Sequence, residues 1–327
     1  MLPLRHLFDN RPLAEMICRH WDLDEQSLEM FTYCRISANA VYPFRHDGRV
    51  RILRFSPVEE KPRESILAEL ELIRHLRARG YNAIEPIPSK KGEMLVRAST
   101  PWGDYHACVF ARVPGASLED TALDDGIMLS YGASLGDLHS LSRGFTPKSR
   151  RWGHEDVLDW AEKVLKGLRA GAPAALREVD ILRAAFSRLP RTPGNYGLVH
   201  FDFELDNVFW DPESRTCHAI DFDDAMYHWF AADIERALNS IQNDAPDGPY
   251  ERWKEIFLKG YRSRCDGEEL PPEHQVLFRR FSNLYGYARV LRSVHETWEN
   301  EPAWMTALRG KLGLTLTSRA ALFGDPV

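Results

Sequence analysis

The sequence of 327 residues lacks any apolar run approaching the roughly 20 residues that a membrane-spanning helix needs. Its first residues also lack the apolar core of a secretory signal peptide. We therefore expect a cytoplasmic protein without a membrane partner. Because 44% of the residues are hydrophobic and 11% aromatic, a chain of this length can fill two closely packed lobes, as a globular enzyme would.

Cysteine is scarce, and no charge of one sign dominates. The five cysteines are scattered, odd in number and without the paired spacing of a zinc site, so neither a disulfide framework nor a zinc centre is expected. The formal net charge is −6 at pH 7 and the pI is about 6.1, with acids and bases mixed throughout. This composition excludes the basic surface typical of nucleic-acid-binding proteins.

Two polar motifs stand out against this background, one in residues 198–207 and one in residues 219–224. A kinase needs one carboxylate to orient the acceptor hydroxyl, and an amide oxygen with a second carboxylate to hold Mg²⁺ against the triphosphate. Asp202 can supply the first group, and Asn207 and Asp221 can supply the other two. The motifs therefore predict a phosphoryl-transfer site.

The segment between the motifs supports this geometry. The apolar runs 208–210 and 216–220 flank the sequence Asp-Pro-Glu-Ser, which has the chemistry of a turn. This pattern predicts a β-hairpin whose outer ends lie side by side. Asn207 and Asp221 can then share one cation, and their hard oxygen ligands suit Mg²⁺.

The motifs resemble those of the aminoglycoside phosphotransferase and choline kinase superfamily. Its members carry a His-Gly-Asp-x-x-x-x-Asn loop and then an Ile-Asp-Phe/Trp-Asp/Glu-Asp/Tyr-Ala segment, which correspond here to residues 200–207 and 220–225. The second motif, together with residues 232–238, is most similar to stress response kinase A and type II homoserine kinases. The resemblance implies ATP-dependent phosphorylation and a bilobal, protein-kinase-like α+β fold, with a small antiparallel-sheet lobe containing one main helix and a mostly helical second lobe.

The predicted order of elements agrees with such a fold. Strands are expected at 33–44, 49–55, 93–98 and 105–113, and helices at 10–20, 62–79, 124–141, 155–168, 174–189, 233–241, 250–262, 272–297 and 302–322. Pro114 and Gly115 break the last of these strands. We therefore place a nucleotide-binding lobe at residues 1–113, and a helical lobe with the catalytic loop and acceptor site at residues 114–327.

Glu69 falls on the apolar stripe of the predicted helix, because Ile66, Ile73 and Leu76 share that face. A buried acid needs a cation, and Arg54, at the end of a predicted strand, is its natural partner. By the resemblance, this pair corresponds to the strand-lysine and helix-glutamate pair of kinases, with Arg54 reaching the α- and β-phosphates. The alternative is a purely structural ion pair, or two side chains in solvent.

The resemblance also suggests the other nucleotide contacts. Residues 36–40 should cover the phosphates, with Ser37 donating a hydroxyl hydrogen bond, although this segment lacks the glycines of protein kinases. Alternatively, Ser37 and Asn39 simply make a turn. Adenine should lie against the last predicted strand of the first lobe and use main-chain groups of Ala111 and Val113.

Four further residues lie in or near the two motifs and bear on the shape of the site. Phe201 departs from the glycine that the family usually has. His200 is expected to brace the loop by hydrogen bonds, and Asp233 to cap the following helix and brace the same loop. Asp223 either contacts a second metal or the substrate, or is a solvated or capping carboxylate.

The sequence thus predicts an ATP-dependent phosphotransferase that moves the γ-phosphoryl group to a hydroxyl of a small molecule. A stress-type protein Ser/Thr kinase is the alternative if the acceptor cleft is open, and a catalytically silent nucleotide-binding module is a second one, against which the intact Asp202, Asn207 and Asp221 argue. Arg289 and Arg292 hint at an acidic acceptor. Aminoglycoside, amino acid, amino alcohol, sugar and protein acceptors stay open, and so does the oligomeric state.

Overall fold

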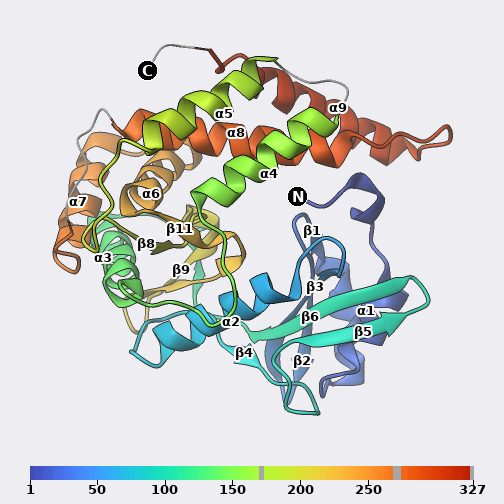
Figure 1. Ribbon diagram of the computed structural model, residues 1–327. Coiled ribbons are helices and arrows are strands. Elements are labelled where there is room, and N and C mark those ends of the chain that lie inside the picture. The colour runs from blue at the N-terminus through green and yellow to red at the C-terminus, as the bar shows by residue number, and fades with distance from the viewer. Residues whose placement is uncertain (169–172, 268–273, 325–327) are drawn as a thin grey trace.

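An antiparallel sheet of six strands forms the amino-terminal part of the computed structural model, which describes residues 1–168, 173–267 and 274–324 (Figure 1). Its strands are β1 (Arg35–Ile36), β2 (Ala40–His46), β3 (Arg49–Pro57), β4 (Pro86–Ile87), β5 (Val96–Thr100) and β6 (Gly103–Ala111). The strand order is β1-β2-β3-β6-β4, and β5 also pairs with β6. This arrangement confirms the predicted small antiparallel sheet.

Two α-helices accompany this sheet. In α1 (Arg11–Cys18), the side chain of Asn10 caps the helix by accepting a hydrogen bond from the amide of Leu13, and Pro12 follows at a position where no helical hydrogen bond is lost. The main helix, α2 (Arg63–Arg77), lies within the range predicted for it and buries the stripe that contains Glu69.

The first predicted strand, 33–44, is wrong as a continuous element. Residues Glu25–Tyr33 form the 3-10 helix η2, and β1 is separated from β2 by a short turn. In this turn the amide of Ser37 donates to the carbonyl of Asn39 at 3.0 Å, so the backbone bonds to itself and interrupts the ladder. A local backbone turn therefore divides the segment that the apolar alternation predicted as one strand.

The carboxy-terminal part also contains short strands, namely β7 (Ala116–Ser117), β8 (Tyr196–Val199), β9 (Val208–Asp211), β10 (Thr216–Ala219) and β11 (Met226–Trp229). The predicted hairpin is confirmed as β9 and β10, with Ala219 opposite Val208. The pair β8 and β11 was not predicted, because we expected helices everywhere else in this part. Strands of four residues are too short for periodicity to reveal.

The helices of this part match the predicted windows closely. They are α3 (Asp125–Ser142), α4 (His154–Gly167), α5 (Pro173–Phe186), α6 (Phe230–Asp244), α7 (Tyr250–Arg262), α8 (Gln275–Val294) and α9 (Ala303–Ala320). The start predicted at Pro272 lies outside the described residues. In the described ranges, no helix is both long and apolar enough to cross a membrane.

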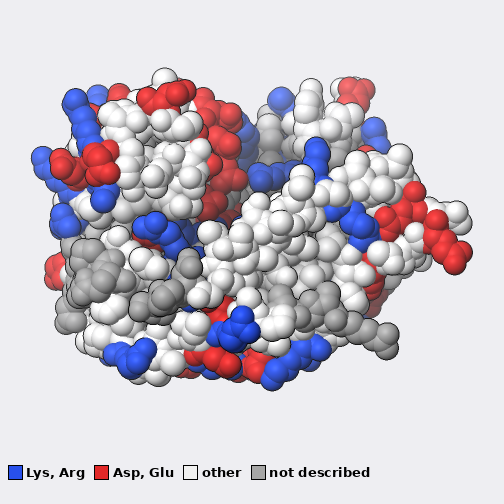
Figure 2. Space-filling model, turned by 90° about the horizontal axis from the view of Figure 1, so that it is seen from above, with Lys and Arg blue, Asp and Glu red and all other residues white. Residues whose placement is uncertain are grey.

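Glycines allow α3 and α7 to approach each other closely. A Cβ atom on Gly132 would lie 1.9 Å from the carbonyl oxygen of Phe257, and one on Gly260 would lie 2.1 Å from that of Leu129. In Figure 1, α4, α5, α8 and α9 form a separate layer above the hairpin. Seen from the side of this layer, basic and acidic side chains are interspersed with large uncharged areas (Figure 2).

One buried apolar core runs through both parts of the molecule. It includes Ile73 of α2, Phe110 of β6, Leu138 of α3, Leu205 of the loop after β8, and Ala219 of β10. Because these residues pack together, the sheet and the hairpin are held against each other. The residues predicted to act on nucleotide and metal are therefore brought to one interface.

Candidate active site

Asp233 anchors the loop that carries Asp202. Its buried carboxylate accepts hydrogen bonds from the amides of His200 at 2.7 Å and Phe201 at 2.6 Å, and Nε2 of His139 lies 3.1 Å away. The predicted bracing of the loop is thus confirmed. The predicted capping is wrong, because Asp233 lies inside the first turn of α6 and not before it.

His200 joins the same loop to the end of the hairpin. Its Nδ1 accepts a hydrogen bond from the amide of Asp202 at 3.2 Å, and its Nε2 lies 2.8 Å from the carbonyl of Ile220. This pattern assigns the proton to Nε2. Burial lowers the pKa of His200, which keeps the ring neutral. Its role is structural, as predicted.

Phe201 adopts a left-handed conformation, with φ at 65°. A glycine at this position, as in the family, would adopt it without strain. Here the strained backbone is offset by burial of the ring, which packs 5.6 Å from Phe281 and 6.0 Å from Tyr285, measured between centroids. The loop therefore keeps its left-handed turn although the residue type differs.

Asp202 is held from two sides. The side-chain nitrogen Nδ2 of Asn207 donates to the backbone carbonyl and to Oδ2 of Asp202, both at 3.0 Å. The guanidinium of Arg236, in α6, contacts Oδ1 of Asp202 and lies 2.7 Å from Glu204. Burial, reinforced by the charge of Asp202, raises the pKa of Glu204 to about 7 although Arg236 opposes the shift. Arg236 is a site residue that our sequence analysis did not identify.

Asn207 and Asp221 lie at adjacent ends of the hairpin, as predicted. The amide of Ile220 donates to the carbonyl of Asn207 at 3.0 Å, which places the next residue, Asp221, beside it. Because the amide nitrogen of Asn207 already faces Asp202, its amide oxygen is the group that is left to bind a metal.

The electrostatics of Asp221 fit a cation site. Although 44% of its side-chain surface is accessible, its position between the two parts of the molecule raises its pKa to about 7, first through burial and then through repulsion by Asp223. Carboxylates that repel each other in this way are stabilised by a divalent cation. The donor set of the Asp221 carboxylate and the side-chain amide oxygen of Asn207 suits a hard ion such as Mg²⁺.

The predicted ion pair between Arg54 and Glu69 is confirmed. Their side chains approach to 2.7 Å, and Glu69 is only 1% exposed. The other guanidinium nitrogen of Arg54 lies 3.4 Å from the carboxylate of Asp221, and the guanidinium carbon is 4.9 Å from the ring centroid of Phe110. Arg54 thus connects α2 with the hairpin.

Asp223 contacts the amino-terminal part of the molecule. It forms an ion pair with Lys61, in the loop before α2, and accepts a hydrogen bond from the side chain of Asn39 at 3.3 Å. Burial alone would raise its pKa, but Lys61 and Arg54 outweigh this effect and hold the pKa of Asp223 well below its ordinary value. Lys61 was not identified from the sequence.

The predicted nucleotide-contact residues lie at the edge of the same region. Ser37 is exposed in the turn after β1. The amide of Ala111, at the end of β6, already donates to the carbonyl of Glu85 at 2.8 Å, so its carbonyl is the group that remains for adenine. Val113 follows two residues later and its side chain is buried in the core.

Arg151 connects the metal-ligand segment with α2. Its guanidinium donates to the carbonyls of Ser65 at 2.8 Å and Phe222 at 3.1 Å, and also to those of Asp223 and Ala225. These four contacts tie the first turn of α2 to the chain that follows the hairpin. No sequence signal marked Arg151, because its partners are backbone groups.

A cavity of about 170 Å³ opens beside Asp223 and Asp224. Its lining includes Trp160 of α4 and Tyr285 of α8, whose rings meet edge to face with centroids 5.7 Å apart. Arg289 also lines the cavity and forms an ion pair with Asp224.

Arg292 forms an ion pair with Glu60. The positive charges that hinted at an acidic acceptor, those of Arg289 and Arg292, are therefore already neutralised by carboxylates.

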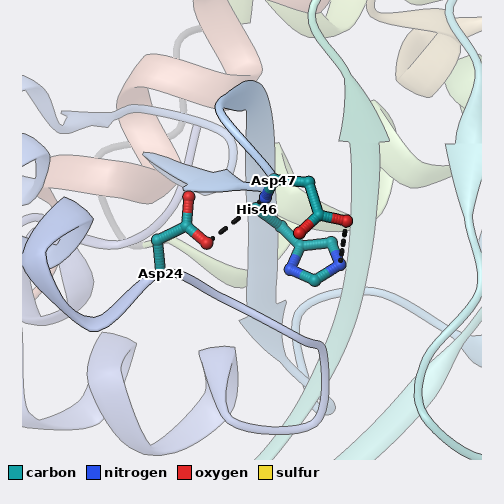
Figure 3. Close-up of side chains that lie close together, drawn as sticks. All are labelled: Asp24, His46 and Asp47. Carbon is teal, nitrogen blue, oxygen red and sulfur yellow. Dashed lines mark hydrogen bonds and ion pairs between the residues drawn. The ribbon is translucent and has the colours of Figure 1, made fainter.

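Another group of possible metal ligands consists of Asp24, just before η2, His46, at the end of β2, and Asp47, in the turn that follows (Figure 3). The carboxylate of Asp24 accepts hydrogen bonds from the amides of Asp47 at 3.2 Å and Gly48 at 3.3 Å. Both amides belong to the turn between β2 and β3, where φ is positive. The group is thus explained as a cap of this turn.

Comparison with known proteins agrees with this geometry. The model of the phosphotransferase enzyme family matches residues 35–267. Amicoumacin kinase of Bacillus subtilis (strain 168) is 27% identical over 289 residues, which are 83% of this chain and 83% of the relative. A homoserine kinase of Agrobacterium fabrum is 30% identical over 227 residues, or 66% of this chain and 65% of the relative.

The solved structures show the same fold. An amicoumacin kinase in complex with AMP-PNP, Ca²⁺ and Ami superposes with a TM-score of 0.72 at 20% identity, and the match covers 98% of this chain and 97% of the other. The predicted bilobal, kinase-like fold and the predicted enzyme class are confirmed. The chain belongs to the phosphotransferase enzyme family and is a kinase that transfers a phosphoryl group from ATP to a hydroxyl of a small molecule.

Proposed function

We propose that Asp202 orients the acceptor hydroxyl and accepts its proton, while Asn207 and Asp221 hold Mg²⁺. The observation that carries this assignment is the pair of 3.0 Å hydrogen bonds between Asn207 and Asp202, together with the backbone bond that places Asp221 beside Asn207. Base and metal ligands thereby belong to one rigid unit. When bound, the ion neutralises charge on the transferring phosphoryl group.

For the nucleotide, we propose that Arg54 contacts the α- and β-phosphates and that Glu69 orients it. The buried geometry of this pair and its contact with Asp221 support the assignment. Ser37 is proposed as a phosphate contact, and Ala111 and Val113 as main-chain contacts of adenine. The boundary between a nucleotide-binding lobe, 1–113, and an acceptor lobe, 114–327, rests on the same division of roles.

The acceptor is proposed to be small. The cavity beside Asp224 holds only about 170 Å³ and is walled in part by α4 and α8, whereas a protein substrate would need an open cleft. Relatives named for amicoumacin and for homoserine support this choice over a protein kinase. The five cysteines are all free thiols, which supports the predicted cytoplasmic location.

An ATP-consumption screen tests the proposal, with aminoglycosides, homoserine, choline, sugars and a protein substrate as acceptors. We expect Mg²⁺-dependent turnover with at least one small molecule, and loss of that turnover in Asp202→Asn and Asp221→Asn. Glu213→Gln, at the exposed tip of the hairpin, is the matched control and should keep full activity. Wild-type protein that fails to bind AMP-PNP would contradict the proposal.

A further inference from the structure

Arg319, near the end of α9, has no carboxylate partner among the residues that the structure describes. Its Nη1 lies 3.4 Å from the side-chain oxygen of Asn283, and its buried Nε has no hydrogen-bond acceptor there. The other two arginines near Asp202 differ in this respect, because Arg236 contacts two carboxylates and Arg289 contacts Asp224. In the described part of the chain, no carboxylate therefore forms a direct ion pair with Arg319.

The guanidinium of Arg319 lies directly on α8 at Gly286. A Cβ atom at Gly286 would have as its three nearest neighbours the guanidinium atoms Cζ, Nη1 and Nη2 of Arg319, at 2.7, 2.7 and 2.9 Å. The absence of a side chain at Gly286 thus creates the place that the guanidinium occupies. The residue before Gly286, Tyr285, lines the cavity beside Asp224.

Stacked contacts connect this place with the catalytic loop. The guanidinium of Arg236 lies 5.2 Å from the ring centroid of Phe201, whose ring is 6.0 Å from that of Tyr285. The guanidinium of Arg289 lies 5.1 Å from the ring centroid of Tyr285. Arg236 and Arg289 therefore flank the rings of Phe201 and Tyr285 beside the proposed base, and both arginines lie near enough to Arg319 for their charges to act on it.

The local field favours an anion at this position. Burial and the nearby charge of Arg236 lower the pKa of Arg319, Glu204 opposes this shift, and Arg289 adds to it. A guanidinium under such repulsion gains most from a ligand that brings negative charge. Its planar fork of donors matches a carboxylate in particular, which can accept two parallel hydrogen bonds.

We propose that Arg319 is a specificity-determining residue of the acceptor site, and that it binds a carboxylate of the alcohol that is phosphorylated. The inference rests on the proposed function and narrows it to hydroxy acids, including hydroxy amino acids. Arg319 takes the place of Arg289 and Arg292 as the cation expected to bind an acidic acceptor, because those two arginines form ion pairs with Asp224 and Glu60.

Matched pairs of alcohols test the proposal, each pair differing by one carboxylate. Suitable pairs are homoserine with 3-amino-1-propanol, serine with 2-aminoethanol, and 4-hydroxybutyrate with 1-propanol. The quantity to measure is the ratio of kcat/KM between the acid and its partner. In wild-type protein at least one acid should be preferred, and in Arg319→Gln the ratio should fall by about 10- to 100-fold, as expected for loss of a charged hydrogen-bonded pair.

Three further variants separate binding from folding. In Arg319→Lys, which keeps the charge but not the fork, the preference should be partly restored. Gly286→Ala should displace the flexible guanidinium and lower the same ratio while leaving the melting temperature no lower, since Ala is the better helix former. Lys311→Gln, an exposed change in the same helix, is the control and should leave the ratio at the wild-type value.

The outcomes distinguish this inference from the proposed function. If wild-type protein prefers no carboxylate in any pair, or if the preference survives unchanged in Arg319→Gln and Gly286→Ala, the inference is overturned. Titration with AMP-PNP is the independent readout, and its affinity should be the same in all these variants. Loss of nucleotide binding already in the wild-type protein would instead overturn the proposed function.

Discussion

The guanidinium of Arg54 lies 3.4 Å from the carboxylate of Asp221, although the two residues belong to the sheet and to the end of the catalytic hairpin, respectively. The same guanidinium is 2.7 Å from Glu69. A single cation therefore links helix α2 to the proposed metal ligand. Changes at Arg54 should affect both folding and nucleotide binding, whereas changes at Asp221 should mainly affect the metal and should not destabilise the fold.

Arg54→Ala is expected to destabilise the protein by about 3–5 kcal/mol, because it leaves the buried carboxylate of Glu69 without its cation. The same variant should bind AMP-PNP more weakly. Urea unfolding and calorimetric titration measure the two effects. Arg97→Ala removes the exposed ion pair with Asp104 and should cost only about 0–1 kcal/mol; equal losses in the two variants would contradict the prediction.

Asp221→Asn should lose Mg²⁺-dependent turnover while keeping the fold. In the metal-free protein the pKa of Asp221 is raised to about 7, so its ionisation costs stability as the pH rises from about 4 to about 7. The variant should therefore be at least as stable as the wild type at pH 8, and the difference should shrink toward pH 4. Melting curves at both pH values check this. Addition of Mg²⁺ with AMP-PNP should raise the melting temperature of the wild type more than that of the Asp221→Asn variant. A variant that melts well below the wild type at pH 8 would show that the carboxylate is structural.

The parts of the site that could be predicted are those with a local signature. The stripe of α2 identified Glu69 and its need for a cation, and the turn between two apolar runs identified the hairpin that joins Asn207 to Asp221. Each of these arguments uses periodicity or turn chemistry within about 20 residues.

The residues that escaped prediction have partners which only the tertiary fold supplies. Lys61 pairs with Asp223 across 162 positions, and Arg151 bonds to backbone carbonyls that carry no sequence information. Arg236 lies in a motif that resembles the family, but its contact with Asp202 depends on how α6 packs under the loop. Strands β8 and β11 were missed because four residues show no reliable period.

Buried histidines should make the protein sensitive to acid. Burial, aided by the charge of Arg191, lowers the pKa of His154 to about 4, and burial holds that of His228 well below its ordinary value. A histidine with a depressed pKa contributes stability above pH 6.5, and this stability is lost as the pH falls toward 4. For His154 alone the loss should be about 3 kcal/mol, since each pKa unit corresponds to about 1.4 kcal/mol.

Urea unfolding at pH 7.5 and pH 5 tests this expectation. In His228→Asn, which removes one of the two rings whose centroids are 5.2 Å apart, the difference between the two pH values should shrink. His20→Gln changes a histidine that is only partly buried and should leave this difference unaltered. Stability that is independent of pH between 7.5 and 5 in the wild-type protein would rule out this source of acid sensitivity.

Asp202→Asn separates catalysis from binding. The carboxylate is proposed to accept the proton of the acceptor hydroxyl, so the amide should lower phosphoryl transfer by about 10²–10⁴-fold. Nucleotide affinity should stay close to the wild-type value, because it depends on Arg54, on the metal ligands Asn207 and Asp221 and on main-chain groups. Single-turnover kinetics with any accepted alcohol, paired with AMP-PNP titration, measures both quantities. Near-normal turnover would remove Asp202 from the role of base, whereas a parallel loss of nucleotide affinity would mean that its bonds with Asn207 mainly hold the metal site together.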